Sequence, residues 1–269
     1  MADFFKRVAD LQNMEQMSQG TSVIHKLHPL VKIVSTVVFI VAVVSFSRYS
    51  ISALIPFFFY PVIMMTLSET PWKPVLYRIV PALPFALFGG VSNIIFDTAP
   101  AMVFGPLTVS FGMLSFVSIL LKTVLTVTAV LILIATTPIT VIATQLIRLH
   151  VPAVFVLQLT MTYRYISVLV GEVSTMMTAY LIRSPRQKRM KMQDVGPFIA
   201  SLLLRSIDRA ERVYAAMKCR GFDGVFRTAK ISGPSMNDLA LLTAIVLVIV
   251  LFRFVNISVL AGNVFSGAF

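Results

Sequence analysis

The chain has 269 residues, of which 57% are hydrophobic and only 13% are charged, and its mean hydropathy is +0.88. A soluble domain of this length cannot bury so much apolar surface in one core, so the composition excludes a soluble protein and indicates an integral membrane protein. The formal net charge of +12 is then better explained by Lys and Arg on the cytoplasmic side of the membrane than by nucleic-acid binding. A single cysteine, Cys219, excludes a disulfide framework.

Residues 1–29 are polar and mixed, and they contain no apolar stretch followed by a small-residue cleavage site, so no signal peptide is predicted. A short amphipathic helix on the membrane surface is predicted from four apolar residues at helical spacing: Phe4, Phe5, Val8 and Leu11. His25 and His28 lie three apart and can in principle share a metal ion. Without a third ligand nearby, a pair of interfacial histidines is favoured.

Apolar segments that approach the ~20 residues needed to cross a bilayer predict five transmembrane helices. These segments are residues 30–46, 51–67, 79–96, 113–136 and 239–259. Pro56 and Pro61 are expected to kink the second helix. Residues 68–74 are expected to form a turn before the third. Candidate N-cap residues for the last helix are Ser235, Asn237 and Asp238.

The distribution of cations predicts the orientation. The N-terminal segment, the connection with Lys73 and Arg78, and residues 137–237 are rich in Lys and Arg, whereas the alternate connections are poor in them. The N-terminus is therefore expected in the cytoplasm and the C-terminus outside. This predicts an all-α integral membrane protein in three parts: residues 1–136 with four spans, residues 137–237 as cytoplasmic helices, and residues 238–269 with the final span.

Few residues inside the spans can carry chemistry. There is no GxxxxGK[ST] phosphate loop, no HExxH and no GxSxG, so ATP binding of that kind is not expected. Carboxylates are nearly absent from the spans, which argues against a stand-alone secondary transporter, a channel or a membrane enzyme. Lys122 is isolated and either snorkels or pairs. Asn93, beside Gly89 and Gly90, contacts either a partner helix or another helix of this chain.

The segment between the fourth and last spans holds most of the charge, with 14 Lys/Arg against 5 Asp/Glu from Arg148 to Lys230. Its pattern predicts a short helix over 139–149 and two long amphipathic helices over 153–183 and 197–220. Small residues form a stripe on the first long helix that suits a crossing helix: Gly171, Thr175 and Thr178. Ala210 and Met217 lie on the apolar face of the second.

Both long helices end in an arginine, in the sequences Ile182-Arg183-Ser184 and Cys219-Arg220-Gly221. Cations at helix C-termini are favoured by the helix dipole, by ~0.3–1 kcal/mol, and this alone accounts for one such end. Two long helices that are too apolar for free solution and too charged to span are expected to lie flat beneath the bilayer. Their guanidinium groups then suit paired carboxylates on another protein.

At these residues the chain resembles the transmembrane T component of energy-coupling factor (ECF) transporters, the CbiQ/EcfT family. The likeness covers nearly the whole chain. Its most specific parts are residues 159–165 with Glu172, and residues 205–224. The family has an X-Arg-X motif at the end of each of two cytoplasmic coupling helices, matched here around Arg183 and Arg220. Ile182 and Cys219 depart from the alanine that is common in the family.

The resemblance implies a scaffold without catalytic activity in a prokaryotic cytoplasmic membrane. Two CbiO-like ATP-binding-cassette ATPases would each receive one arginine-tipped end, and they, not this chain, would bind ATP and Mg²⁺. A separate CbiM-like substrate-binding S subunit, with or without a small accessory membrane subunit, would lie against the chain in the bilayer. The resemblance favours the cobalt/nickel branch, with the vitamin-importing branch as the alternative, and it implies no metal site in this chain.

Overall fold

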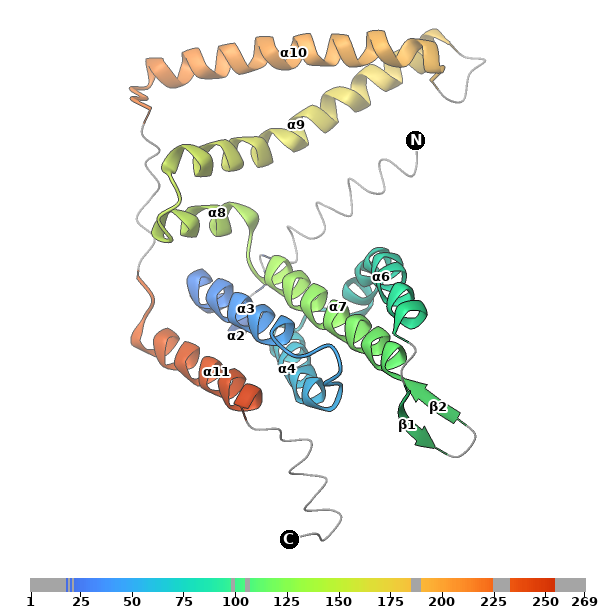
Figure 1. Cartoon of the computed structure of the whole chain (residues 1–269). Coiled ribbons are helices and arrows are strands. Elements are labelled where there is room, and N and C mark those ends of the chain that lie inside the picture. Colours follow the sequence, from blue (N-terminus) through green and yellow to red (C-terminus); the bar gives the residue numbers. More distant parts are fainter. Residues whose placement is uncertain are drawn as a thin grey trace. The chain divides into compact units, whose positions relative to one another are not determined.

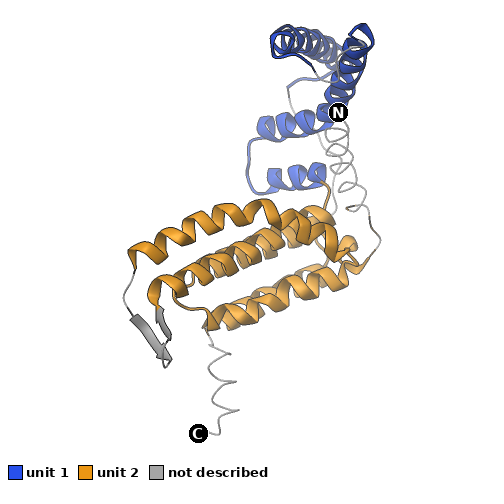
Figure 2. Ribbon diagram, turned by 90° about the vertical axis from the view of Figure 1, so that its right-hand side faces the viewer, with its two compact units in different colours: residues 1–13, 139–231 blue, residues 14–138, 232–269 orange. Residues whose placement is uncertain are grey.

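A computed structural model describes residues 18, 20, 22–97, 111–184, 190–224 and 233–254, together with the backbone of 100–104 and 107–110 (Figure 1). The chain divides into two compact units (Figure 2). Unit 1 comprises Met1–Asn13 and Ile139–Ile231, and unit 2 comprises Met14–Pro138 and Ser232–Phe269. The amphipathic helix predicted around Phe4 to Leu11 and the last residues of the final predicted span lie outside the described residues.

Unit 2 is a bundle of helices around α7 (Phe111–Thr136). The other elements in chain order are α2 (Val23–Lys26), α3 (Pro29–Val44), η1 (Ser52–Phe58), α4 (Phe59–Leu67), α5 (Trp72–Ile79), η2 (Val80–Ala82), α6 (Leu83–Phe96), β1 (Pro100–Phe104), β2 (Leu107–Ser110) and α11 (Met236–Phe254). Helix α7 contacts α3, η1, α4, α5 and α6. The strands form a short antiparallel hairpin between α6 and α7, which the sequence pattern does not predict.

The core of unit 2 forms where α3, η1, α7 and α11 meet. Fully buried side chains from these elements pack together, and the largest are Phe39, Phe57, Leu54 and Leu125. Phe39 stacks on Tyr60 with ring centroids 4.3 Å apart. The outer faces of the same helices are also apolar. The helices are therefore hydrophobic both toward the core and toward the outside, as helices embedded in lipid are.

The predicted all-α class is confirmed, and the helices fall close to the predicted spans. Within the described residues, four helices are long and apolar enough to cross a membrane: Trp72–Phe96, Phe111–Thr136, Ala153–Arg183 and Met236–Phe254. Three of these are predicted spans. The first two predicted spans form shorter apolar helical segments, Pro29–Val44 and Ser52–Leu67. In the second, Pro56 lies inside a 3₁₀ segment, which accommodates its missing N–H.

The predicted turn over 68–74 is too long. A helix begins at Trp72 and continues through η2 into α6, so Lys73 and Arg78 are helical. Pro74 is compatible with this start because the first turn of a helix has no partner for its N–H groups. The chain reverses at Glu69, whose φ of 54° is left-handed. Both cations lie in the first two turns of the candidate span Trp72–Phe96.

The contact of α6 with α7 depends on small residues. Asn93 donates from Nδ2 to Ser115 Oγ at 2.8 Å, and a Cβ on Gly90 would collide with the ring of Phe116. A Cβ on Gly112 would lie 2.6 Å from the backbone oxygen of Asn93. The two helices therefore approach as closely as their backbones allow. Of the two alternatives for Asn93, the structure favours packing within this chain.

The two cations near the C-terminal end of α3 have specific partners. Lys122 donates from Nζ to the carbonyl oxygen of Phe46 at 2.7 Å. Arg253 donates to the carbonyl and hydroxyl oxygens of Ser45 at 3.3 and 3.2 Å, and its guanidinium lies over the ring of Phe46. Ser45 and Phe46 follow the last residue of α3, so both cations lie at the negative end of that helix, where its dipole favours positive charge.

At the opposite end of α3, a buried lysine joins three segments of unit 2. Lys32 is 3% exposed and donates from Nζ to the carbonyl oxygen of Thr136 at 2.9 Å and to that of His25 at 3.3 Å. Nearby, Nδ1 of His28 accepts from the N–H of Leu30, so His28 caps α3. Lys32 thus holds the last carbonyl of α7, three residues before the chain enters unit 1.

The start of α11 agrees with the capping prediction. Ser235 Oγ accepts from the N–H of Asp238 at 3.3 Å, and Asp238 Oδ2 accepts from the N–H of Ser235 at 3.0 Å. This reciprocal pair is a capping box with Asp in place of Glu. It begins the final helix of unit 2 at the residues that the sequence indicates.

Unit 1 contains α8 (Ile139–Arg148), α9 (Ala153–Arg183) and α10 (Met192–Cys219). A tight turn joins α8 to α9, with His150 in the left-handed region at φ 64° and Pro152 before the first residue of α9. The bounds of α9 are those predicted. The second long helix begins at Met192, five residues earlier than predicted, and Pro197 lies inside it. We refer to α9 and α10 as the arms.

Candidate functional site

The C-terminal end of α9 presents Arg183 to solvent. Arg183 is the last helical residue, and Ser184 follows with its N–H bonded to the carbonyl oxygens of Tyr180 and Leu181. The sequence continues with Pro185, and a residue before proline avoids the helical conformation. Ile182 is 74% exposed, and Arg183 is exposed beside it. The predicted motif Ile182-Arg183-Ser184 therefore lies at a helix end whose first two motif residues are exposed to solvent.

The end of α10 is built differently but presents the same chemistry. Arg220 caps the helix, and Gly221 adopts φ 80°, a left-handed conformation that glycine reaches without steric cost. The N–H of Phe222 then bonds the carbonyl oxygen of Met217 at 3.1 Å, and the N–H of Gly221 bonds that of Lys218 at 2.9 Å. This is a Schellman motif. Cys219 and Arg220 are both exposed.

The arms form an antiparallel hairpin. Tyr180 near the end of α9 donates to Asp194 Oδ2 in the first turn of α10 at 2.6 Å, and Glu172 pairs with residues further along α10. Because the two helices run in opposite directions, their C-terminal residues Arg183 and Arg220 lie at opposite ends of the hairpin. The 28 residues of α10 separate them by ~42 Å at 1.5 Å per residue.

One carboxylate connects the middle of the two arms. Glu172 Oε1 accepts from Arg205 Nη1 at 2.7 Å, and Oε2 accepts from Arg209 Nη2 at 3.1 Å. Arg205 and Arg209 are four residues apart and therefore lie on the same face of α10. The side chain of Glu172 is 21% exposed and both its oxygens are used. We call this set of three residues the clamp.

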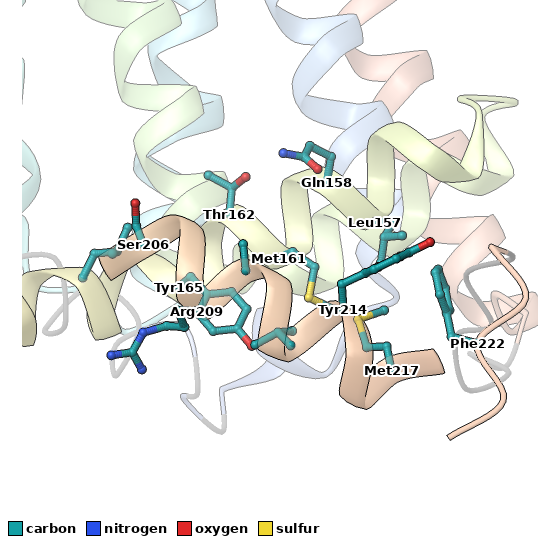
Figure 3. A pocket seen from close by; sticks show the side chains of 13 residues that line it. Leu157, Gln158, Met161, Thr162, Tyr165, Ser206, Arg209, Tyr214, Met217 and Phe222 are labelled. Atoms are coloured by element: carbon teal, nitrogen blue, oxygen red, sulfur yellow. The ribbon is translucent and has the colours of Figure 1, made fainter. Parts of the chain in front are cut away.

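Between the clamp and the Arg220 end, the arms enclose a groove of 390 Å³ (Figure 3). Its walls are mostly apolar, with Met161, Tyr165 and Leu169 from α9 facing Val213 and Met217 from α10. Ala210 also lines it, so Ala210 and Met217 lie where the arms meet, as expected of the apolar face of α10.

The stripe of small residues on α9 lies elsewhere. Gly171, Thr175 and Thr178 are all exposed, and a Cβ on Gly171 would meet nothing within 4 Å. The hydroxyls of Thr175 and Thr178 bond carbonyls one turn back in α9 itself. Within the described residues the stripe is therefore not the surface that α10 crosses, which differs from the predicted crossing of the two long helices at this stripe.

The clamp is the feature that sequence reasoning missed. Glu172, Arg205 and Arg209 fall in the parts of the sequence most specific to the family, but their pairing across 33 and 37 residues requires the register of the hairpin. The available signal was the spacing of Arg205 and Arg209, which places two guanidinium groups where one carboxylate can accept from both.

The described residues contain no group of three or more His, Cys, Asp or Glu side chains that could hold a metal ion. His25 Nδ1 lies 2.7 Å from Ser22 Oγ, and the ring of His28 caps α3, so both histidines have local structural partners. The chemistry at the site is that of exposed guanidinium groups at two helix ends, which suits binding of carboxylates.

The fold and the site together define a multi-pass α-helical membrane protein with a cation-rich pair of helical arms. The family model for the cobalt transport protein CbiQ matches residues 20–231, more than half of the chain. The chain therefore belongs to the CbiQ family of cobalt transport proteins. Among curated proteins, it is 31% identical over 107 residues to the cobalt transport protein CbiQ of Rhodobacter capsulatus. That alignment spans 39% of this chain and 43% of the relative.

Proposed function

We propose that this chain is the transmembrane coupling scaffold of an ECF-type ABC importer. The observation that carries the proposal is the placement of Arg183 and Arg220, which end two arms at opposite ends of one antiparallel hairpin. Each end is exposed, cationic and ~42 Å from the other along α10. Two ATPases can therefore each receive one end in a surface groove, with carboxylates accepting from the guanidinium.

The proposal places α9 beneath the bilayer, although α9 has the length and composition of a span. Glu172 near the middle of α9 pairs with two guanidinium groups of α10. Arg164, also on α9, is exposed. Carrying these charges into hydrocarbon would cost at least ~2.5–3.5 kcal/mol each. At the membrane surface the same charges remain hydrated while the apolar side chains meet lipid or a neighbouring subunit.

In this arrangement closure of the ATPases on ATP moves the two arm ends, and the arms pass the motion to a substrate-binding S subunit in the bilayer. The chain itself catalyses no reaction and binds no nucleotide. The arms and the N-terminus face the cytoplasm, and the C-terminus lies outside a prokaryotic cytoplasmic membrane. The excess of Lys and Arg in residues 148–230 supports this orientation.

For the cargo, we propose cobalt or nickel ions. Membership in a family of cobalt transport proteins supports this, as does the resemblance of residues 205–224 to the metal-importing branch. The ion would be bound by the S subunit, because this chain contributes no set of metal ligands among its described residues. A vitamin importer is the alternative, since the scaffold does not itself contact the cargo.

Affinity purification of the tagged chain from its native membrane tests the scaffold. We expect two ATPase subunits and a membrane-embedded S subunit to be recovered with it. A version with residues 153–224 deleted serves as the comparison, because it keeps the tag and every helix of unit 2, α11 included, but lacks both arginine ends. Recovery of the intact chain without any ATPase would overturn the proposal.

Uptake of labelled ions tests the cargo. Cells that produce the full transporter are expected to accumulate radioactive cobalt or nickel, and deletion of this chain alone should abolish ATP-dependent accumulation. Biotin, riboflavin and folate are measured in the same cells. Loss of vitamin uptake, with unchanged metal uptake, would assign the chain to the vitamin-importing branch.

A further inference from the structure

The clamp divides the hairpin into two unlike halves. On the Arg183 side, the arms are joined a second time, by the hydrogen bond from Tyr180 to Asp194, and the N–H of Lys191 bonds the same tyrosine oxygen. On the Arg220 side, the arms diverge around the apolar 390 Å³ groove. Polar bonds have preferred lengths and angles, whereas apolar contacts across an open groove can slide.

The clamp also lies near the middle of the hairpin. Glu172 is 11 residues before Arg183, or ~16 Å along α9, and Arg209 is 11 residues before Arg220, a similar distance along α10. A change in the angle at the clamp therefore moves Arg220 relative to Arg183. Since one carboxylate accepts from two successive turns of α10, it fixes both the rotation of that helix and its position along α9.

We infer that Glu172 is a positioning residue: through Arg205 and Arg209 it sets the separation of the arms on the Arg220 side, and hence the spacing of the two arginine ends. Its functional consequence rests on the proposed coupling role. Glu172 touches neither ATPase nor cargo in this scheme. Its loss leaves each end intact but misplaces one with respect to the other, so ATPase motion is transmitted less completely.

A distance measurement on the full chain tests the positioning without the ATPases. Spin labels are placed in a Cys219→Ser background at Val154→Cys, exposed near the start of α9, and Ala215→Cys, exposed near the end of α10. In lipid nanodiscs, Glu172→Gln should broaden the distance distribution and shift it to longer values. Glu211→Gln is the matched control, because Glu211 is an exposed carboxylate of α10 outside the clamp.

Rescue separates an ion-pair role from a general loss of stability. Glu172→Arg combined with Arg205→Glu and Arg209→Glu reverses every charge of the clamp and should restore the narrow distribution. If Glu172→Gln and Glu211→Gln give the same distribution as the wild type, or if the reversed clamp stays as broad as Glu172→Gln, the positioning role is wrong. These results stand whether or not the chain binds an ATPase.

The functional readout uses the assembled transporter. Glu172→Gln should retain the ATPases and their ATP hydrolysis but import roughly three- to tenfold less cobalt per ATP, the range expected on losing a partly exposed two-pair network. The charge-reversed clamp should recover most of the wild-type ratio of cobalt imported to ATP hydrolysed. An unchanged ratio in Glu172→Gln would refute the coupling consequence, while failure of the wild type to bind any ATPase would instead refute the scaffold.

Discussion

Replacing Arg183 and Arg220 together with glutamate is expected to abolish co-purification of the ATPases while the chain still inserts in the membrane. Each arginine lies at an exposed helix end, so the substitution leaves the packing of the hairpin unchanged. Removing one partner of a buried, hydrogen-bonded charge pair at an interface costs ~2–5 kcal/mol, and reversing its sign adds repulsion. Two such losses, one per ATPase, exceed what a complex of ordinary affinity can tolerate.

The matched control moves the same charges elsewhere on the same helices. Arg164→Glu with Arg212→Glu changes one exposed arginine on each arm and gives the same net charge. This variant should retain both ATPases. If the variant Arg183→Glu with Arg220→Glu co-purifies with the ATPases normally, the docking role is wrong. If both double variants lose the ATPases equally, the interaction depends on overall charge instead of on the two helix ends. Single variants should each retain a partial complex.

The fold was largely predictable because lipid-facing helices carry a strong local signal. The long apolar runs predict α6, α7 and α11, and the proline after Ser184 predicts the end of α9. The starts of two helices were not predictable from the sequence. Trp72 begins a helix because Pro74 falls in its first turn, and α10 begins at Met192 although Pro197 appears to mark the start. Pro74 is the third residue of its helix, where no N–H partner is lost, whereas Pro197 is the sixth residue of α10 and lies inside it.

The site was predictable only at its ends. Arg183 and Arg220 are marked by local residues, Pro185 after the one and Gly221 after the other. The clamp depends on the register between helices that meet far apart in sequence, and no periodicity within one helix carries that information. For the same reason the small stripe around Gly171 suggested a crossing helix, whereas α10 packs on the face of Met161 and Leu169.

Lys32→Ala is expected to lower the apparent melting temperature of the purified chain by roughly 10 °C, from a loss of about 3–5 kcal/mol. Lys32 is almost fully buried, and its ammonium serves the carbonyl oxygens of Thr136 and His25. Truncation leaves these acceptors unsatisfied, at ~1–3 kcal/mol each, and adds the cost of a cavity. Lys26→Ala, at an exposed position in the preceding helix, should have little effect. Equal melting temperatures for the two variants would contradict the assignment.

Lys32→Met tests the consequence for coupling without the cost of a cavity, because it keeps roughly the volume of the side chain and removes its donors. Thr136 ends α7, and α8 of unit 1 begins three residues later, so the freed carbonyl lies beside one of the covalent connections through which the proposed motion would reach unit 2. With Arg183 and Arg220 intact, this variant should co-purify with both ATPases yet import several-fold less cobalt per ATP, since the loss of a charged hydrogen bond of ~1.5–3 kcal/mol loosens that junction. The arginine variant loses binding and uptake together. If Lys32→Met loses binding as well, or keeps full uptake, then the end of α7 does not transmit the motion.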